Sequence, residues 1–551
     1  MKNKSKISGF LLIASMYCVG MYILPLQLMR FDLSRIPGDL GDARLNNYLL
    51  EHGYKWLTGQ VASFWDAPFF YPALRTMSYS DNHLGTLPIY AFFRLLEFDR
   101  ETSYQLWFLV IFTLNYFSCA WVLKKLSINS LGSAVGAFIF SFSLPVLARI
   151  GHSQLLPRFM IPFSFYFTLN YFEKPTNKLF IFTCISVVFQ FYLTIYMGLF
   201  LSIGLAFLFI ANYILTINNI NKEKYKITHY YRQVTIKFLI LIVPIAILLP
   251  LLWPYYKTAL ELGGRQWGEI KLMLPRFSSY FYPPNGSLSW NWLTPIGRML
   301  PMPWEHQIFV GGFPILAFIM MPVFYFRNRI DPLSRKGMLA FITVGLLILL
   351  TLYFNYSLYK IASYIPGLNA IRAVTRIILM DLFLLSIITG VIITKISEKK
   401  SLLSNTSRKI AFTFIALIII ILDQYVITTN SNSYSKSESQ NRLKIIENLV
   451  QRKDPSAKVF AYMPSPSSEP HIVHLDAMLA AQNLNMATVN GYSGKFPVGY
   501  LGYFYEHYDR CEAYYVWMIA STQNKYGSKY RYDLFKDVLI IGRDDCLISR
   551  Q

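Results

Sequence analysis

Long apolar runs separated by short polar segments recur along most of the chain. The first covers residues 7–29 and is close to the length that a helix needs to cross the hydrocarbon core of a bilayer. The stretch over 179–217 carries no charged residue and is too long for one crossing, so we divide it near residues 196–198. The pattern predicts a polytopic α-helical membrane protein with about eleven transmembrane helices. The remaining runs lie near 104–123, 132–149, 157–172, 235–253, 308–326, 337–355, 376–394 and 410–427.

The basic N-terminal segment MKNKSK precedes the first run, which lacks a small-residue cleavage site. We therefore interpret this run as a retained signal anchor, with the N-terminus in the cytoplasm. Alternating the helices from that start makes five segments cytoplasmic, and nearly all are rich in Lys or Arg, as the positive-inside rule requires. They are 124–125, 173–178, 218–232, 327–336 and 395–409. We expect a multi-pass protein of the inner (plasma) membrane.

Three longer segments are predicted on the outer face, over 30–103, over 254–307 and from about residue 428 onward. In the last of these, 436–453 reads as an amphipathic helix, and 458–464 and 537–545 read as strands. We therefore divide the chain into a transmembrane domain over 1–427 and a small extracytoplasmic α/β domain over 428–551.

The composition agrees with a membrane protein, because 54% of the residues are hydrophobic and only 15% are charged. The net charge of +22 does not indicate nucleic-acid binding, since the Lys and Arg residues lie between apolar runs and not on one basic face.

Of the five cysteines, three lie in apolar runs and two lie in the predicted outer C-terminal region. Cys18, Cys119 and Cys184 lie in apolar runs and are interpreted as packing residues. Cys511 and Cys546 lie in the outer C-terminal region, where the oxidising compartment favours a disulfide between them. Two unpaired thiols are the alternative, and no CxxC or His/Cys metal spacing occurs.

The first outer segment holds the leading candidates for chemistry. Asp39 and Asp42 flank a Leu-Gly pair, and helical periodicity begins at Asp42, with Arg44 on another face than Tyr48. Such a helix is predicted to lie along the membrane surface and to hold the two carboxylates at the water–lipid boundary. A carboxylate there can act as a general base toward a hydroxyl group. Alternatively, Asp42 is the N-cap of the helix and Asp39 is a solvated turn residue.

Further along the same segment, Asp81 is a candidate N-cap of another helix or a substrate-binding group. His83 is a candidate proton carrier or metal ligand. The simpler interpretation of His83, and of His52, is a hydrogen-bonded histidine at an interface.

Two arginines on the predicted outer side, Arg372 and Arg376, are four residues apart, so one helical face would present both. The positive-inside rule does not explain them, whereas a lipid phosphate or diphosphate would suit a pair of guanidiniums. A salt bridge to a loop carboxylate or ordinary headgroup contact is the alternative. Asp381 lies deeper in that helix and is either functional or paired with one of these arginines.

Three more residues are predicted near an outer-facing cavity, which we expect where the first outer segment meets Arg372. Glu305 either binds an acceptor hydroxyl or caps the helix expected to begin at Ile308. His152 and Arg158 lie beyond the outer end of another helix and are placed in the same cavity.

The segments GDLGDARLNNYLLEHGYKWLTG, FFYPALRTMSYSDNHLG and NGYSG (490–494) resemble a group of bacterial GT-C-like membrane proteins, akin to multi-helix proteins that modify lipoteichoic acid. The whole architecture resembles the GT-C class of membrane glycosyltransferases. The resemblance implies a polyprenyl-phosphate-linked sugar donor, bound from the outer leaflet. It places the catalytic base at Asp42 or Asp39 and allows a divalent ion, Mg²⁺ or Mn²⁺.

We therefore expect a glycosyltransferase that moves a hexosyl or pentosyl group from the lipid-linked donor to a cell-envelope glycan or lipid acceptor. Asp42 and Asp39 are the catalytic candidates. The substrate-binding candidates are Arg44, Asp81, His83, Glu305, Arg372 and Arg376. A transporter or flippase for a lipid-linked glycan and a non-catalytic envelope-assembly protein are the alternatives. Apart from Asp381, charges deep in the membrane are nearly absent, which favours surface chemistry over passage.

Overall fold

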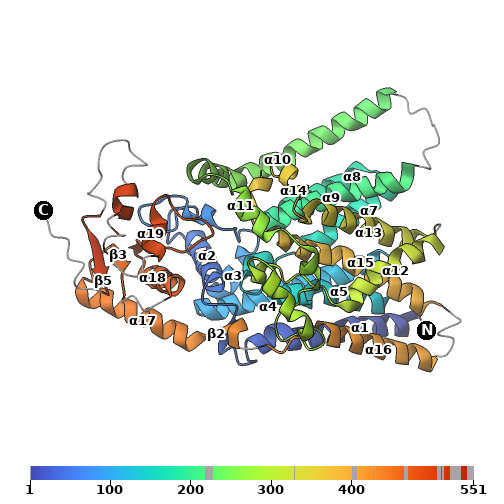
Figure 1. The fold of residues 1–551 in the computed structure, drawn as a ribbon, viewed down its shortest axis with the longest axis horizontal. Helices are drawn as coiled ribbons and strands as arrows, with labels where there is room; N and C mark the ends of the chain where they lie inside the picture. Colours follow the sequence, from blue (N-terminus) through green and yellow to red (C-terminus); the bar gives the residue numbers. More distant parts are fainter. Residues whose placement is uncertain are drawn as a thin grey trace.

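The structure is a computed structural model. It describes residues 2–217, 227–327, 329, 331–365, 367–399, 406–428, 430–464, 469–505, 511, 514, 516–521 and 535–542. A bundle of helices, here called the helical part, spans α1 and α4 to α16, and the elements from β2 to β5 form the C-terminal part (Figure 1). The short helices α2 and α3 lie between the two parts (Figure 1).

A helix lies at each of the eleven apolar runs predicted from the sequence. Among the residues that the structure describes, seven helical segments are long and apolar enough to cross a membrane, and α8 and α12 are shorter apolar helices. The eleven helices are α1 (Lys2–Met21), α4 (Arg100–Lys125), α5 (Ser130–Phe142) with α6 (Leu144–Leu147), α7 (Met160–Glu173), α8 (Asn177–Leu193), α9 (Ile195–Thr216), α10 (Ile227–Leu262), α12 (Gly312–Arg327), α13 (Pro332–Thr351), α15 (Ile378–Ser397) and α16 (Thr406–Gln424).

The other elements lie in the segments that connect these helices or in the C-terminal part. The helices among them are η1 (Tyr22–Leu26), α2 (Asp42–Leu57), η2 (Thr76–Tyr79), α3 (Leu87–Leu95), η3 (Ser153–Leu155), α11 (Trp267–Ile270), η5 (Lys271–Met273), η6 (Phe277–Phe281), η7 (Asn291–Met299), η8 (Pro303–Glu305), α14 (Tyr359–Ala362), η9 (Leu368–Ala370), η10 (Val374–Ile377), η11 (Asn430–Asn432), α17 (Lys436–Lys453), α18 (Pro470–Leu484) and α19 (Tyr500–Tyr505). The strands are β1 (Arg35–Pro37), β2 (Ser433–Ser435), β3 (Val459–Tyr462), β4 (Ala487–Thr488) and β5 (Val538–Ile541).

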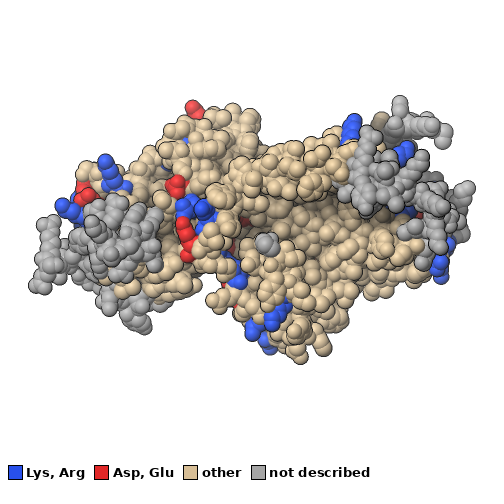
Figure 2. Space-filling model, turned by 90° about the horizontal axis from the view of Figure 1, so that it is seen from above, with Lys and Arg blue, Asp and Glu red and all other residues tan. Residues whose placement is uncertain are grey.

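The described parts of three segments predicted to be cytoplasmic, 173–178, 327–336 and 395–409, lie together at one end of the helical part. Lys336 forms an ion pair with Glu173 at 3.1 Å, and Lys395 forms one with Asp331 at 2.9 Å. Between the two ends, the surface in Figure 2 is almost free of charged side chains. The alternating helix directions predicted from the sequence are therefore consistent with the packing.

In the C-terminal part, three strands form a parallel sheet in the order β4-β3-β5. The predicted amphipathic helix over 436–453 is α17, and the two predicted strands contain β3 and β5. A second, antiparallel pairing joins β1 in the first outer segment to β2, with Ile36 opposite Tyr434. The domain boundary at 427/428 remains a prediction.

Cys511 is disulfide-bonded, and Cys18, Cys119 and Cys184 are free. The predicted partner of Cys511, Cys546, lies outside the described residues.

Helix α2 does not lie on the membrane surface as the sequence predicted. Every residue from 43 to 53 is buried, because α2 is covered by α18 on one side and by α3 and α4 on the other. Tyr48, expected at headgroup level, packs edge-on against Phe69 inside the protein. The apolar face of α2 is thus used for packing between the helical and C-terminal parts.

Arg44 joins α2 to α18 through a buried ion pair with Asp476. Asp476 also contacts Arg442 of α17 at 3.2 Å. Both members of the Arg44–Asp476 pair are buried, so removing one would leave a charge with little compensation.

We expect Arg44→Ala to lower the free energy of unfolding by about 3 kcal/mol, the lower end of the range for a broken buried pair, because Arg442 still faces Asp476. Thermal unfolding of the full chain in detergent measures the effect. The control is Glu173→Ala, which removes a half-exposed carboxylate from Lys336 and should cost less than about 1 kcal/mol. Equal losses in the two variants would contradict the structural role of the Arg44–Asp476 pair.

Candidate active site

A cavity of about 170 Å³ lies where the helical part meets the C-terminal part. Its walls come from the start of α2, the start of α9, the end of α10, the segment before α15 and the loop after β4. Apolar and tyrosine side chains line it on the α9 and α10 side. The ionisable residues that line it are Asp42, Asp81, His152, Arg265, Arg372, Arg376 and Lys495, together with tyrosines 79, 196 and 255.

Asp42 is the first residue of α2, and its carboxylate faces this cavity. One oxygen, Oδ1, accepts a hydrogen bond of 2.9 Å from the hydroxyl of Tyr492. The other, Oδ2, lies 2.6 Å from Nδ1 of His152. The side chain is 27% exposed, so a bound molecule can reach it.

The N-cap of α2 is Gly41 and not Asp42 as the alternative interpretation held. The capping role falls to Asp39, whose Oδ1 accepts from the backbone N–H groups of Gly41 and Ala43 at 3.2 and 3.3 Å. Asp39 is exposed and does not line the cavity. The first turn of α2 is therefore stabilised by Asp39, which leaves Asp42 free for another role.

Behind Asp42, charges of alternating sign follow one another into the protein. His152 Nε2 lies 3.0 Å from Nη2 of Arg376 and 3.6 Å from Oε1 of Glu305. Glu305 binds Arg376 through both oxygens, at 2.6 and 3.2 Å. In a neutral imidazole Nε2 accepts a hydrogen bond from Arg376. A protonated imidazole loses that bond but is attracted to the carboxylates of Glu305 and Asp42.

This arrangement changes the proton affinities. Burial opposes ionisation of Asp42, but His152, Tyr492 and Arg376 outweigh it and lower the pKa of Asp42 to about 2. Burial and Arg376 oppose protonation of His152, but Asp42 and Glu305 outweigh them and raise its pKa. Burial also disfavours the charge on Glu305, whose pKa is nevertheless held well below its usual range, chiefly by Arg376.

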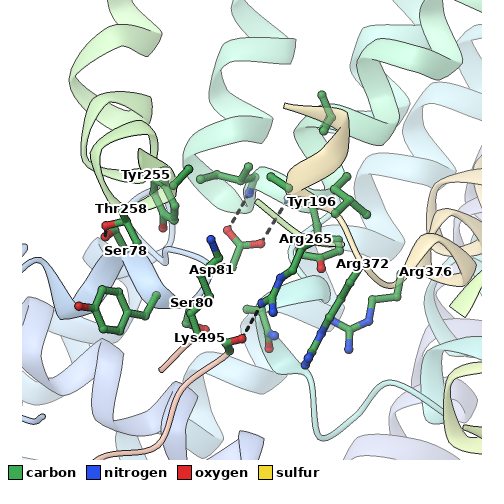
Figure 3. A pocket seen from close by; sticks show the side chains of 18 of the residues that line it. Ser78, Ser80, Asp81, Tyr196, Tyr255, Thr258, Arg265, Arg372, Arg376 and Lys495 are labelled. Atoms are coloured by element: carbon green, nitrogen blue, oxygen red, sulfur yellow. Dashed lines mark hydrogen bonds between the residues drawn. The ribbon is translucent and has the colours of Figure 1, made fainter. Parts of the chain in front are cut away.

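The guanidiniums of Arg265, Arg372 and Arg376 lie side by side in the cavity (Figure 3). Glu269 of α11 joins the first two, because its Oε1 lies 3.2 Å from Arg265 and 3.1 Å from Arg372. The guanidinium of Arg376 also lies over the ring of Tyr196, 5.4 Å from its centre. The sequence predicted that one helical face presents Arg372 and Arg376, but α15 is preceded by the 3₁₀ turn η10 and Arg372 lies before it.

Asp81 forms the floor of the same cavity and caps α9, not the helix that follows it in sequence. Its carboxylate accepts from the hydroxyl of Thr194 at 2.6 Å and from the backbone N–H groups of Ile195 and Tyr196 at 2.8 and 3.3 Å (Figure 3). These bonds satisfy the free N–H groups at the start of α9 and explain the break between α8 and α9. Burial raises the pKa of Asp81 in spite of them.

The loop after β4 reaches the cavity from the C-terminal part. Asn490 fastens it to β3 by accepting from the N–H of Tyr462 at 2.7 Å and donating to its carbonyl at 2.9 Å. Gly491 follows because a Cβ there would lie 2.0 Å from the ring of Phe70. Tyr492 then extends to Asp42. Further on, the carbonyl of Gly494 accepts from Arg265, and Lys495 Nζ donates to the carbonyl of Gly263 at 2.7 Å.

Glu305 lies behind the cavity wall and holds Arg376, and it does not cap α12, which begins later than expected, at Gly312. The group that accepts from the N–H of Gly312, at 2.8 Å, is Asp423.

Three other predicted residues lie away from the cavity. Arg44 is in the ion pair with Asp476. His83 is linked to the cavity only through Asn46, which accepts from its Nε2 at 2.8 Å and in turn donates to Gln154 at 2.8 Å. Burial lowers the pKa of His83 to about 3, so it is a neutral hydrogen-bonding group at ordinary pH. Asp381 forms no ion pair with Arg372 or Arg376.

Arg158 and His52 also lie away from the cavity. Arg158 does not share the cavity with His152, because it donates to the carbonyls of Leu379 and Phe140 in the core of the helical part. His52 bonds to the carbonyls of Ser63 and Phe64, as the simpler interpretation predicted.

The contacts of Tyr492, Arg265 and Glu269 at the site were not predicted. The NGYSG segment that contains Tyr492 entered only the resemblance, and Arg265 lies in the predicted outer segment over 254–307. Among the described residues, no group of three or more His, Cys, Asp and Glu side chains has an arrangement that could hold a metal ion.

No protein-family model matches the chain, and no curated protein matches it significantly. The structure is similar to that of the arabinofuranosyltransferase AftD from Mycobacteria, with a TM-score of 0.44 and 10% identity over 84% of this chain and 30% of that one. It is also similar to the oligosaccharyltransferase of Archaeoglobus fulgidus, with a TM-score of 0.49 and 11% identity over 88% of this chain and 64% of that one. The chain thus spans less than two thirds of either protein.

Both of these proteins are glycosyltransferases, which is the class of enzyme that the sequence resembles. The chemistry of this chain is therefore inferred from its cavity and not from these two proteins.

The Asp42–His152 pair predicts a pH-dependent stability. The raised pKa of His152 adds stability that is fully present below about pH 6.5, the ordinary histidine value, and is lost as the pH rises through the raised value. Asp42 stays ionised over this range, since its pKa is about 2. We therefore expect His152→Gln to lower the melting temperature more at pH 6 than at pH 9. The control is His471→Gln, at an exposed histidine. A difference that does not change with pH would refute the pairing.

Proposed function

We propose that this chain is a membrane glycosyltransferase that uses a polyprenyl-phosphate-linked sugar as donor and a hydroxyl of a cell-envelope glycan or lipid as acceptor. The observation that carries the proposal is the meeting of Asp42 with Arg265, Arg372 and Arg376 in one cavity. Asp42 comes from near the start of the chain, Arg265 from its middle, and Arg372 and Arg376 from its second half. A carboxylate and a row of guanidiniums are the groups that such a transfer requires at its two ends.

In the proposed reaction, Asp42 takes the proton of the acceptor hydroxyl while the hydroxyl oxygen attacks the anomeric carbon of the sugar. The bond between that carbon and the phosphate oxygen breaks, and the phosphate keeps the electron pair. Arg265, Arg372 and Arg376 stabilise the negative charge that builds on it. The proton on Asp42 then passes to water or to the released phosphate.

The apolar side of the cavity supports a lipid-linked donor. Ile195, Leu199 and Ala259 line it on the α9 and α10 side. Beyond the cavity, α10 presents large exposed apolar residues such as Phe238 and Val243, which suits contact with lipid chains. A prenyl chain could therefore leave the cavity toward the bilayer while its phosphate stays with the arginines.

The proposed topology has eleven crossings in the plasma membrane, with the N-terminus in the cytoplasm and the C-terminal α/β domain outside. The cavity lies at the end of the helical part opposite the lysine-rich end formed by Lys124, Lys336 and Lys395. The positive-inside rule therefore supports an outer position for the cavity, where a lipid-linked sugar and an envelope acceptor would meet.

Both oxygens of Asp42 already have partners, which bears on how the acceptor enters. His152 holds Oδ2, and Tyr492 donates an O–H to Oδ1. An acceptor hydroxyl would donate to Oδ1 in the same way. We therefore propose that Tyr492 occupies the place of the acceptor hydroxyl and gives it up when the acceptor binds.

The first test is Asp42→Asn, which keeps the size of the side chain but cannot take a proton. We expect sugar transfer to fall roughly 10²- to 10⁴-fold, the usual contribution of a general base. Mass spectrometry of cell-envelope glycans, with and without the gene, identifies the sugar that is lost, and transfer is then assayed in isolated membranes.

Asp39→Asn is the matched control, because Asp39 is exposed, lies outside the cavity and only accepts from the N-terminus of α2. Full transfer by the Asp42→Asn protein would end the proposed mechanism. The assay is run with EDTA and with added Mg²⁺ or Mn²⁺, since the resemblance also allows a divalent ion.

The second test is Tyr492→Phe, which removes only the hydroxyl on Oδ1. The acceptor no longer competes with that hydroxyl, so we expect its KM to fall by roughly two- to tenfold, with kcat changed little. Steady-state kinetics with varied acceptor measures both constants. Tyr500→Phe is the control, because Tyr500 donates to the carbonyl of Val489 in the same region without touching Asp42. A large fall in kcat at unchanged KM would show instead that Tyr492 orients the base.

A further inference from the structure

A second pocket, of about 80 Å³, lies within the helical part and shares no lining residue with the candidate active site. It lies between α12, α13 and α15, and Tyr280 of η6 forms one wall. Ile315 and Phe318 come from α12, and Val344 and Ile348 come from α13. The lining side chains are apolar except for the hydroxyl of Tyr280 and the carboxyl group of Asp381.

Asp381 is 3% exposed, and its Oδ1 has no hydrogen-bond partner in the described part of the chain. The two arginines nearest in sequence are engaged elsewhere, Arg372 with Glu269 and Arg376 with Glu305. A carboxyl group in apolar surroundings without a counter-charge is stable in its neutral form, because an unpaired buried charge is very costly. The neutral form has one O–H donor.

Close in sequence to the lining residues, the two flanking helices present apolar side chains to the outside. Leu316 and Ile319 on α12 are 54% and 63% exposed, and Leu349 on α13 is 62% exposed. In a membrane-spanning helix, such a surface faces lipid chains. A molecule that enters the pocket must therefore come from the bilayer.

These features define the occupant chemically. It needs an apolar chain to lie against Ile315, Phe318 and Ile348, and one uncharged acceptor for the O–H of Asp381. No Lys, Arg or His lines the pocket, so an anionic headgroup would find no cation there. Asp381 also lies five residues beyond Arg376, roughly 7 Å deeper along the helix, which is below headgroup level.

We propose that this pocket binds an acyl chain of a membrane glycerolipid, with the ester carbonyl of that chain accepting a hydrogen bond from Asp381. The site does not depend on the proposed transferase activity. The ester carbonyl of the lipid would be the hydrogen-bond partner that the Oδ1 atom of Asp381 lacks within the described part of the chain.

The experiment uses the full-length protein in nanodiscs that contain a phosphatidylcholine probe with a photoactivatable diazirine in one acyl chain. Two forms of the probe are compared, one with ester linkages and one with ether linkages that lack the carbonyl. After irradiation, mass spectrometry measures labelling of α12 and α13, and labelling of the lipid-exposed stretch of α10 serves as the reference. We expect the ester probe to label α12 and α13 about three- to tenfold more than the ether probe.

Two variants separate the hydrogen bond from the charge. Asp381→Leu has no donor and should reduce labelling by the ester probe to the level of the ether probe. Asp381→Asn keeps an N–H donor and should retain most of it. Labelling of α10 should be the same in all three proteins, which also shows that the variants are folded.

Equal labelling by ester and ether probes in the wild-type protein would overturn the proposal without any need for a variant. Loss of labelling in both Asp381→Asn and Asp381→Leu would also overturn it, since it would show that the pocket requires a carboxylate and therefore binds a cationic group.

Discussion

The burial of α2 against the C-terminal part decides where the carboxylate of Asp42 lies. Arg44 and Asp476 join the helix to α18, and β1 pairs with β2 immediately before α2 begins. With α2 held on both sides, its first residue can face only the cavity between the two parts. A helix lying freely on the membrane surface would leave Asp42 in water, with no fixed relation to the arginines.

The second constraint is the balance of charge behind the cavity surface. Glu305 pairs with Arg376, and Glu269 lies between Arg265 and Arg372. In surroundings of low dielectric constant, three unpaired guanidiniums would repel one another strongly, and each would be costly to bury. The two glutamates reduce that cost, yet they leave guanidinium N–H groups directed into the cavity (Figure 3). The row of arginines is therefore held in place by the two glutamates.

Much of the architecture was predictable because it depends on local patterns. Runs of apolar residues locate the helices of the helical part, and helical periodicity predicts α17. The sequence predicted a break near residues 196–198 in the uncharged stretch over 179–217. In the structure the break between α8 and α9 lies at Thr194, a few residues earlier. Each of these features follows from the side chains of one contiguous segment, which need only the bilayer or a protein core as partner.

The site was predictable in part. Asp42, Arg372 and Arg376 were placed in one outer cavity from residue type and topology, and the structure brings them together there. The capping roles were assigned wrongly, because Asp81 caps a helix more than a hundred residues away and Asp39 does the work expected of Asp42. The contact between Tyr492 and Asp42 joins residues 450 positions apart and has no local signature.

By itself, the sequence located the apolar helices to within several residues, the basic segments between them, and the longer polar segments that could hold a site. Only the tertiary structure decided which carboxylate faces the arginines, which acids serve as caps and counter-charges, and that Asp381 remains unpaired with Arg372 and Arg376. The physical reason is the separation along the chain between the groups that interact. Hydrophobic burial and helix formation act on neighbours along the chain, whereas hydrogen bonds and ion pairs depend on a few ångströms between groups that only the folded chain brings together.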